Sequence, residues 1–241
     1  MRVKRLAAAV LVALLAGPVC AGDIAAFSPI GFSPDGSLFA FEEYGVQDGS
    51  GFPYSNIYAI NTVDDTFLPG TPIRTRIENE AAGVGEARAT SLAQAQAWIA
   101  KHRLADHPGQ IVAFDPVSEV GADPHHIRYR AFPAEPAVGE PFTLQIEELE
   151  EAPPAACKDV VKVVKGFRLL LTERDGAAVK ETVYEDGHVP GSRNCPTGYR
   201  LGGVMTFQPD NGDTLHIALV MVLSHGFEGR DGRWIALPVR P

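Results

Sequence analysis

Phe32-Ser33-Pro34-Asp35-Gly36, with the residues that follow it as far as Asn61, decides the fold of this chain. Pro34 fixes its own φ at a value that suits the second position of a tight turn. Asp35 is tolerated at the third position, and Gly36 suits the fourth position or a left-handed residue after it. The segment therefore predicts a tight turn that leads directly into regular structure.

The turn is followed by an apolar run, Leu38-Phe39-Ala40-Phe41, which is too short for a stable helix and predicts a strand. Residues 45–53 are dense in glycine and predict a long loop. Residues 56–61 then predict a returning strand. The turn, the two strands and the loop between them form one β-meander unit.

Residues 78–101 are the only convincing helical region of the sequence. Ser91 and Gln94 have the spacing of a capping box at a helix start. An apolar face is formed by Leu92, Ala95 and Ile99. One apolar face is what packing against a sheet requires, so we interpret this helix as packed on a sheet rather than as a partner-binding helix.

The rest of the chain predicts short strands separated by turns. Asp175-Gly176 between two alternating runs indicates a tight hairpin. Residues 147–156, rich in Glu and Pro, predict an exposed loop or a domain boundary. Further strands are expected at residues 73–77, 111–114, 126–132, 142–146, 167–172, 178–184, 204–207, 215–223 and 234–237. The predicted fold class is mainly β, with antiparallel meanders and hairpins in a sandwich-like or incomplete propeller arrangement and one packed α-helix.

A second meander near the end of the chain echoes the first. Gln208-Pro209-Asp210-Asn211-Gly212 repeats the turn chemistry of residues 32–36 with one inserted residue. Generic turn chemistry explains the likeness equally well, because hairpins reuse the same residues. If the two units are related, they are expected in one sheet or in neighbouring blades, where they would protect sheet edges.

Residues 32–61 resemble the repeat of TolB-type β-propellers, in which Phe-Ser-Pro-Asp-Gly precedes one strand and Ile-Tyr-x-Ile-Asn closes the next. The match occurs once at full strength, whereas a propeller needs several blades. Taken whole, the chain resembles domain-of-unknown-function family 2259, a family of predicted secreted bacterial proteins. This resemblance rests on the same opening block, on residues 113–119, on Asp123-Pro124 and on the segment near Cys195. It implies secretion, and it implies no activity or catalytic residue.

The first 21 residues predict a secretory signal peptide. A basic cluster of Arg2, Lys4 and Arg5 precedes the unbroken apolar run of residues 6–15, which is too short for a transmembrane helix. Small residues before a cut after Ala21 complete the pattern. We therefore expect a single secreted β-rich domain over residues 22–241. We expect it to reside in the periplasm, which is an oxidising compartment, with no stable membrane insertion after cleavage.

The charge of the chain excludes two classes of partner. Its formal net charge is −9, and loss of the three basic residues of the signal makes the mature chain more acidic still. Nucleic acids and anionic membrane surfaces are bound through clustered Lys and Arg, and the mature sequence has no basic run longer than two residues. The charge indicates a soluble protein without a nucleic-acid partner.

Cys157 and Cys195 are the two cysteines that remain after removal of the signal, which contains Cys20. An even pair in an oxidising compartment predicts a disulfide. It would close a loop of about 39 residues, worth roughly 4 kcal/mol in the chain-entropy model. The alternative, a catalytic or metal-binding thiol, has no CxxC motif or nearby histidine pair to support it.

The sequence has no specific catalytic, cofactor or metal motif. Ser192 and the Ser224-His225 pair have no placed base or orienting acid. His125 and His126 are adjacent on a predicted strand, so they face opposite ways and cannot easily share a metal. Asp186 is interpreted as part of a solvated loop, and His216 as a buried or half-buried strand residue.

The loop of residues 42–56 is the candidate interaction site. Its aromatic and acidic residues can anchor a protein or sugar partner, and the candidate residues are Tyr44, Asp48, Phe52 and Tyr54. The competing interpretation is that Phe52 and Tyr54 tuck into the core and that the acids, including Glu42 and Glu43, are solvated. Calcium binding by these carboxylates is a weaker alternative, because their spacing does not match an EF-hand.

These observations lead to one functional hypothesis and one rival. The first is a non-enzymatic binding or envelope-associated module that contacts another envelope protein. The rival is a hydrolase whose site is assembled from scattered loops. An enzyme should show a concave pocket with convergent titratable groups. A binding module should show a flat apolar patch or an open strand edge.

Overall fold

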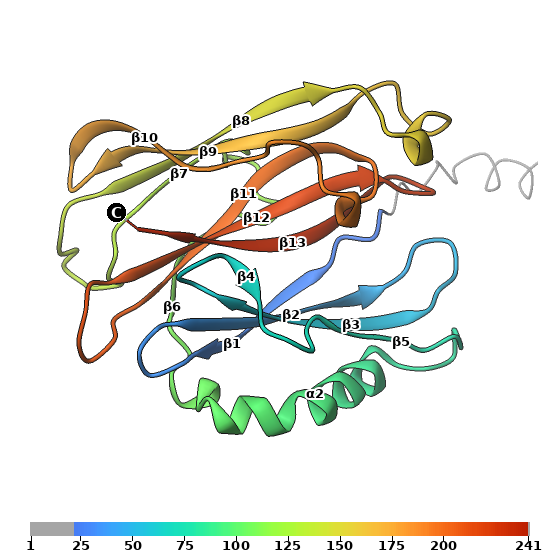
Figure 1. Ribbon diagram of the computed structural model, residues 1–241, viewed down its shortest axis with the longest axis horizontal. Helices are drawn as coiled ribbons and strands as arrows, with labels where there is room; N and C mark the ends of the chain where they lie inside the picture. Colours follow the sequence, from blue (N-terminus) through green and yellow to red (C-terminus); the bar gives the residue numbers. More distant parts are fainter. Residues whose placement is uncertain (1–21, 241) are drawn as a thin grey trace, which may run out of the picture.

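Three antiparallel sheets and one long helix stack in four layers in the computed structural model, which describes residues 22–240 (Figure 1). Helix α2 (Val84–Lys101) covers one face of the first sheet, and the other two sheets lie successively above it. The predicted signal peptide lies outside the described residues. The mainly β, antiparallel fold class with one packed helix is confirmed.

The three sheets differ in strand order, and only in the first does one strand edge pair with two other strands. The first sheet has the order β1-β2-β3-β4, with β5 also paired to β3; the central sheet has the order β13-β12-β11-β6, and the outer sheet β10-β9-β8-β7. Their strands are β1 (Ala26–Phe32), β2 (Leu38–Val46), β3 (Pro53–Asn61), β4 (Thr66–Phe67), β5 (Ile73–Arg76), β6 (Gln110–Phe114), β7 (His126–Tyr129), β8 (Phe142–Glu151), β9 (Val164–Arg174), β10 (Ala177–Glu185), β11 (Pro196–Phe207), β12 (Leu215–His225) and β13 (Arg230–Val239).

The central sheet is buried on both faces. In β12, Ala218, Val220 and Val222 pack into the core shared with the outer sheet. The alternate residues of β12 pack into the core shared with the first sheet, and these are Ile217, Leu219 and Met221. A strand buried on both faces needs a continuous apolar sequence, which explains the uninterrupted run in this strand.

Helix α2 lies on the first sheet through a stripe of small residues. Ala87, Ser91, Ala95 and Ile99 are buried at four-residue intervals, and they form the face that packs on the sheet. The predicted packing of the helix is confirmed, but the predicted capping box is wrong. The helix begins after Gly83, and Ser91 lies in its interior, where its hydroxyl donates a hydrogen bond of 2.9 Å to the carbonyl oxygen of Ser55.

The two similar meanders lie in different sheets that pack face to face. Residues 34–60 belong to the first sheet and residues 209–237 to the central sheet, and the Phe32 and Phe207 rings stack between them at 4.9 Å. Neither a shared sheet nor neighbouring blades is observed. The propeller-like interpretation of residues 32–61 is not supported, because the described part of the chain forms layers and no closed propeller.

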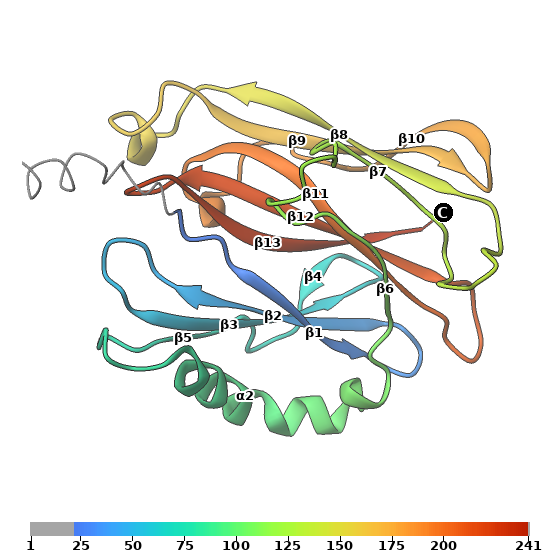
Figure 2. The same ribbon diagram turned by 180° about the vertical axis from the view of Figure 1, so that it is seen from behind.

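Two segments differ from the sequence-based expectation. Strand β1 was not predicted, because Pro29 and a bulge between Pro29 and Gly31 disguise it. Proline is tolerated there because β1 is an edge strand. Residues 147–151, expected in a loop, continue β8, where they pair with β9. From α2 the chain crosses to the central sheet through β6, as the view from behind shows (Figure 2).

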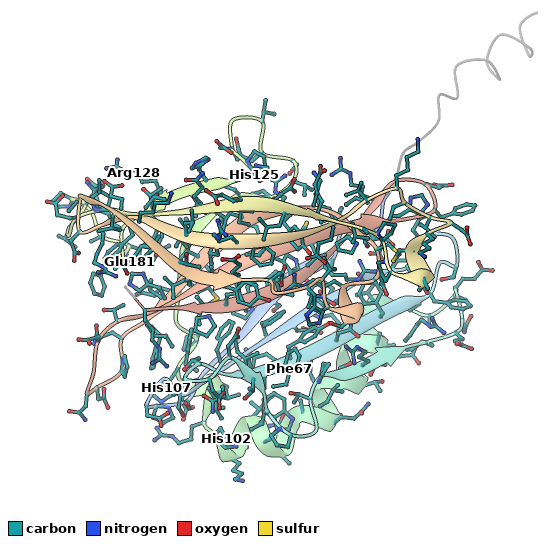
Figure 3. All side chains as sticks on the ribbon, turned by 45° about the horizontal axis from the view of Figure 1, so that its top comes forward. Phe67, His102, His107, His125, Arg128 and Glu181 are labelled. Carbon is teal, nitrogen blue, oxygen red and sulfur yellow. A yellow bond between two sulfur atoms is a disulfide. The ribbon has the colours of Figure 1, made fainter. Side chains whose placement is uncertain are left out.

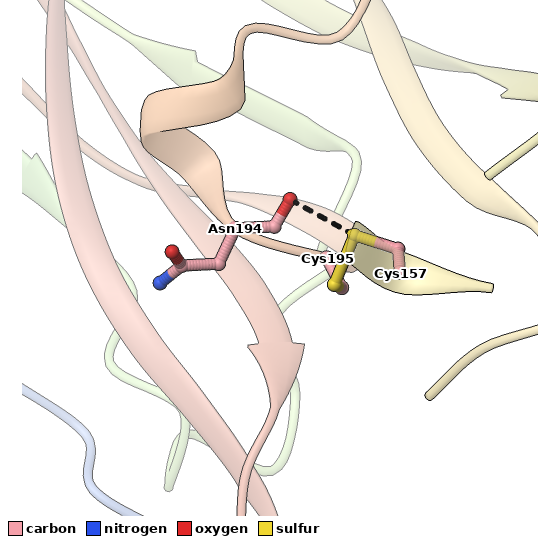
Figure 4. The surroundings of a disulfide bond; sticks show 3 residues. All are labelled: Cys157, Asn194 and Cys195. Atoms are coloured by element: carbon pink, nitrogen blue, oxygen red, sulfur yellow. Dashed lines mark hydrogen bonds between the residues drawn. A yellow bond between two sulfur atoms is a disulfide. The ribbon is translucent and has the colours of Figure 1, made fainter. Parts of the chain in front are cut away.

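The disulfide joins Cys157 to Cys195, as predicted (Figure 4). Cys157 lies after β8 and Cys195 immediately before β11, with 5.6 Å between their Cα atoms. The bridge therefore closes the base of the β9–β10 hairpin. The tip of that hairpin has the predicted Asp175-Gly176 turn, with positive φ at both residues.

His216 is enclosed between the central and outer sheets. Its side chain is buried, and its Nδ1 lies 2.8 Å from the hydroxyl of Tyr129. The ring also packs edge-on against Phe142. Burial disfavours the charged imidazolium and lowers the pKa of His216 to about 4. The prediction of a buried strand residue at this position is confirmed.

Removal of the disulfide should destabilise the fold without changing it. Replacing both Cys157 and Cys195 by alanine is expected to lower the free energy of unfolding by about 4 kcal/mol, because the unfolded chain regains the entropy of a long loop. Urea denaturation of the oxidised protein and of the double variant measures this. Reduction of the unmutated protein is the control, and an unchanged urea midpoint in both would contradict the prediction.

Acid should unfold the protein partly through His216. The unfolded histidine binds a proton near pH 6.5, whereas the folded one resists protonation until about pH 4. The stability from the neutral ring is therefore complete above pH 6.5 and is lost as the pH falls toward 4. Between pH 7 and pH 4.5 we expect His216→Leu to lose about 2 kcal/mol less stability than the unmutated protein. Parallel pH profiles from urea titrations would refute this.

Candidate functional site

A cleft lies beside β13, the edge strand of the central sheet, and residues of the first and outer sheets complete its lining. One part of the cleft has a volume of about 540 Å³, and an adjoining part has about 400 Å³. The two parts share Asp65, Tyr184 and Leu237 in their linings. We call this feature the β13 cleft.

The walls of the β13 cleft come from the first sheet and from the outer sheet. Phe67 belongs to the first wall and Glu181 to the second (Figure 3). The wall from the first sheet is aromatic and consists of Phe41, Tyr58 and Phe67. Phe67 is 56% exposed, so its ring is accessible at this wall. Aromatic walls with a few polar groups are typical of ligand-binding sites.

Glu43 lies at the floor of the cleft and ties the first sheet to the central one. Its side chain is almost fully buried, at 1% exposure. It accepts hydrogen bonds from the Asn56 amide (3.0 Å), the Tyr58 hydroxyl (2.9 Å) and the backbone N–H of Trp234 (2.8 Å). Burial is the largest effect on this carboxyl and raises its pKa, while the three donors oppose that shift.

Arg233 is held against the start of the described chain. Its guanidinium forms an ion pair with Asp23 and lies over the Tyr54 ring, 4.7 Å from the ring centroid. The Tyr54 hydroxyl donates to the other Asp23 oxygen at 2.8 Å. The charge of Arg233 is thus balanced by Asp23 within the fold. Arg233 lines the cleft, but its guanidinium is already paired.

Arg193 is similarly occupied on the opposite wall. It pairs with Asp186 at 2.6 Å and donates to the hydroxyls of Tyr184 and Tyr199. Asp186 also accepts the backbone N–H of Phe167, so the interpretation of Asp186 as solvated is wrong. A buried carboxylate is costly unless it is hydrogen-bonded, and the partners of Asp186 meet this requirement.

Arg74 differs from these two arginines. Arg74 is exposed on β5 and lines the cleft. Its side chain forms no hydrogen bond or ion pair with the residues from 22 to 240. Its guanidinium is therefore available to an acidic group that enters the cleft.

The predicted interaction residues do not meet on one surface. Tyr54 is buried at 5% exposure. Tyr44 is half-buried under the Arg88 guanidinium, which lies 3.9 Å from the ring centroid. Asp48 accepts the backbone N–H of Glu228 at 2.8 Å, and Phe52 is half-buried. The connection between β2 and β3 is shorter than predicted, because both strands extend into it.

Glu42 and Glu43 are strand residues that face opposite layers. Both are buried, so the interpretation of these two acids as solvated is wrong. Glu42 points to helix α2, where it pairs with Arg88 at 2.8 Å and accepts the Ser55 hydroxyl. Glu43 points to the central sheet. Successive strand residues face opposite ways, so the two carboxylates cannot share a calcium ion.

No pair of nucleophile and base is assembled in the described part of the cleft. Ser192 and Ser224 both belong to its lining, and neither hydroxyl is hydrogen-bonded to a histidine or a carboxylate there. Among residues 22–240 no three histidine, cysteine or acidic side chains are placed to hold a metal ion.

The cleft leaves no local pattern in the sequence, because its residues are scattered from β2 to β13. One signal was available. Pro238 lies in an otherwise regular strand sequence, and proline within a strand indicates an edge whose N–H side has no partner strand. The run of residues 230–239 could therefore have been identified as an open edge.

Glu43 should contribute to stability mainly by satisfying buried donors. Glu43→Ala leaves the Asn56, Tyr58 and Trp234 donors without their acceptor, and we expect a loss of about 2–4 kcal/mol in the free energy of unfolding. Glu43→Gln retains one acceptor oxygen and should lose less. Urea denaturation measures both, with Glu78→Ala as an exposed control. Equal, small effects of all three substitutions would contradict this account of the floor.

Comparison with known proteins agrees with the sequence resemblance. A family model described as predicted secreted protein, DUF2259, matches residues 40–240, which include every residue that lines the cleft. Comparison with curated proteins gave no match. Within residues 22–240 no helix is long and apolar enough to cross a membrane. The chain belongs to the DUF2259 family of predicted secreted proteins.

Proposed function

We propose that this protein is a non-enzymatic binding protein of the periplasm, and that it binds its ligand in the β13 cleft. The observation that supports this is the cleft itself, about 540 Å³ in its larger part, with an aromatic wall on one side and the edge strand β13 along its length. This volume is in the range of ligand-binding sites. We propose another envelope protein as the partner.

The chemistry of the cleft favours binding over hydrolysis. Three titratable groups of the cleft, Glu43, Arg193 and Arg233, are each engaged in hydrogen bonds or ion pairs within the fold. Covalent hydrolysis needs a nucleophile within hydrogen-bond reach of a base. The serines of the cleft have no such base among the described residues, so the rival hydrolase has less support.

Export from the cytoplasm agrees with the family and with the disulfide. The periplasm in particular, the signal peptide of residues 1–21 and a single domain over residues 22–241 remain part of the proposal. The pattern of Arg2, Lys4 and Arg5 before an apolar run supports cleavage after Ala21.

Site-specific photocrosslinking in the secreting cell tests the proposal. A photoreactive phenylalanine is placed at Phe67, on the wall of the cleft, or at Phe227, an 83% exposed ring in the turn between β12 and β13. Both replace one exposed phenylalanine, so they are matched. We expect one adduct of defined mass from position 67 and none from position 227.

The other outcomes have different meanings. An adduct from position 227 alone would move the binding surface to the neighbouring loop of Asp48, because Gly49 of that loop packs against Phe227. No adduct from either position, combined with ester or peptide hydrolysis that Ser192→Ala or Ser224→Ala abolishes, would replace the binding proposal by the hydrolase.

A further inference from the structure

We propose that the ligand of the β13 cleft is an extended peptide segment of another protein, which binds as an additional strand on the free edge of β13. The inference rests on the proposed function, since it assumes that the cleft is the binding site. It specifies the class of ligand and the backbone groups that bind it.

The pairing of β13 with β12 shows which backbone groups face the cleft. The register between the two strands is unbroken from His216–Val239 to His225–Arg230. In such a pair, successive residues point their N–H and C=O groups alternately toward the partner and away from it. The N–H of Trp234 points away, because it donates to Glu43. Pro238 has the same parity and has no N–H to lose.

Ala236 lies between these two residues and shares their parity. Its N–H and C=O groups therefore point away from β12, into the cleft that Ala236 lines. Within residues 22–240 neither group has a hydrogen-bond partner. Strand edges with unpaired groups of this kind are templates for pairing with another chain.

The protein already uses this edge for strand pairing at its other end. Gly232 has the same parity, and its N–H donates to the Asp23 carbonyl at 2.9 Å while its own carbonyl accepts the Ala25 N–H at 3.0 Å. The pairing is parallel and stops there, because the chain turns away into β1 at Ala26. The edge beyond Gly232 thus continues an existing contact that the protein's own chain leaves incomplete.

The shape of the cleft favours a strand as its occupant. The cleft is lined by the first sheet on one side and by β10 on the other, with β13 between them. The central sheet lies between the other two sheets (Figure 1). Packed sheets are spaced at about 10 Å. The first and outer sheets, which flank the central sheet, are therefore separated by the thickness of one sheet, which is the thickness of an added strand. The two parts of the cleft follow β13 from Trp234 to Arg240.

The walls indicate the side chains that such a peptide carries. Alternate residues of an added strand face opposite walls. One set meets the aromatic wall of Phe41, Tyr58 and Phe67, which favours apolar side chains. Arg74, exposed beside this wall, favours a carboxylate. We therefore expect an extended segment with apolar residues at alternate positions and one acidic residue.

A phage-displayed library of linear random dodecapeptides provides the probe, with the mature oxidised protein as the target. Enriched peptides are synthesised, and their dissociation constants are measured by fluorescence polarisation for the unmutated protein and for three variants, Ala236→Pro, Pro238→Ala and Arg74→Ala. Ala236→Pro removes the N–H that faces the cleft and breaks no bond to β12, as Pro238 shows for the same parity. We expect about tenfold weaker binding or more, from the lost hydrogen bond and the proline ring.

Pro238→Ala is the matched control, because it adds an N–H to the same edge. Binding to this variant should be as tight as to the unmutated protein or tighter. Peptides without an acidic residue should be less sensitive to Arg74→Ala than peptides that contain one.

Amide hydrogen exchange of the unmutated protein gives a second measurement, which does not depend on the folding of a variant. The bound peptide should slow exchange of the Ala236 N–H, which is free of β12. The amides of Ile235 and Leu237 point to β12 and should exchange slowly with or without peptide. Unchanged exchange at Ala236 in a saturated complex would overturn the inference.

Two further results would also overturn it, namely the absence of any enriched peptide and enriched peptides that bind Ala236→Pro as tightly as the unmutated protein. These results leave the proposed function testable by itself. An adduct at position 67 in the cell, without strand pairing at Ala236, would retain the cleft as a binding site for a ligand of another class. Failure of the crosslink with successful peptide pairing would place the fault in the cellular proposal.

Discussion

Burial of the central sheet on both faces is the constraint on which the rest of this structure depends. The apolar residues of β12 are divided between two cores, so a sheet must cover each face. The first sheet supplies one cover and is itself buried on its far side by α2. The outer sheet supplies the other cover and leaves its own far side to charged residues. The order of layers follows from this arrangement.

Buried polar groups connect each layer to the next. Glu42 binds Arg88 of the helix, Glu43 binds the backbone of Trp234, and Asp186 binds Arg193. A buried carboxylate without partners is costly, and removal of one partner destabilises more than loss of an exposed pair. The exposed pairs on the outer sheet, such as Arg128 with Glu173, contribute little by comparison.

The β13 cleft is a consequence of the same layering. The central sheet ends at β13, and residues of both neighbouring sheets line the cleft beside this strand. The segment that begins at Asp23 covers only the Gly232 end of the edge. Glu43 satisfies the next outward N–H, that of Trp234. Further along, the fold provides no partner strand. A site for strand addition results from incomplete coverage of one edge, with side chains of both neighbouring layers around it.

The sequence by itself determined the elements whose signals are local. Apolar runs located most strands, Asp175-Gly176 located the hairpin, and two cysteines in a chain with a secretory pattern determined the disulfide. These signals depend on neighbouring residues or on simple counting. Strand β1 was missed because Pro29 conceals an edge strand.

Only the tertiary structure decided the layer order, the opposite faces of Glu42 and Glu43, the burial of Tyr54 and the position of the cleft. An acidic residue in a strand indicates exposure unless its partner is known, and the partner of Glu43 is 191 residues away along the chain. Long-range partners of this kind leave no local pattern. The physical reason is that burial and edge exposure are properties of packed layers, which no single segment possesses.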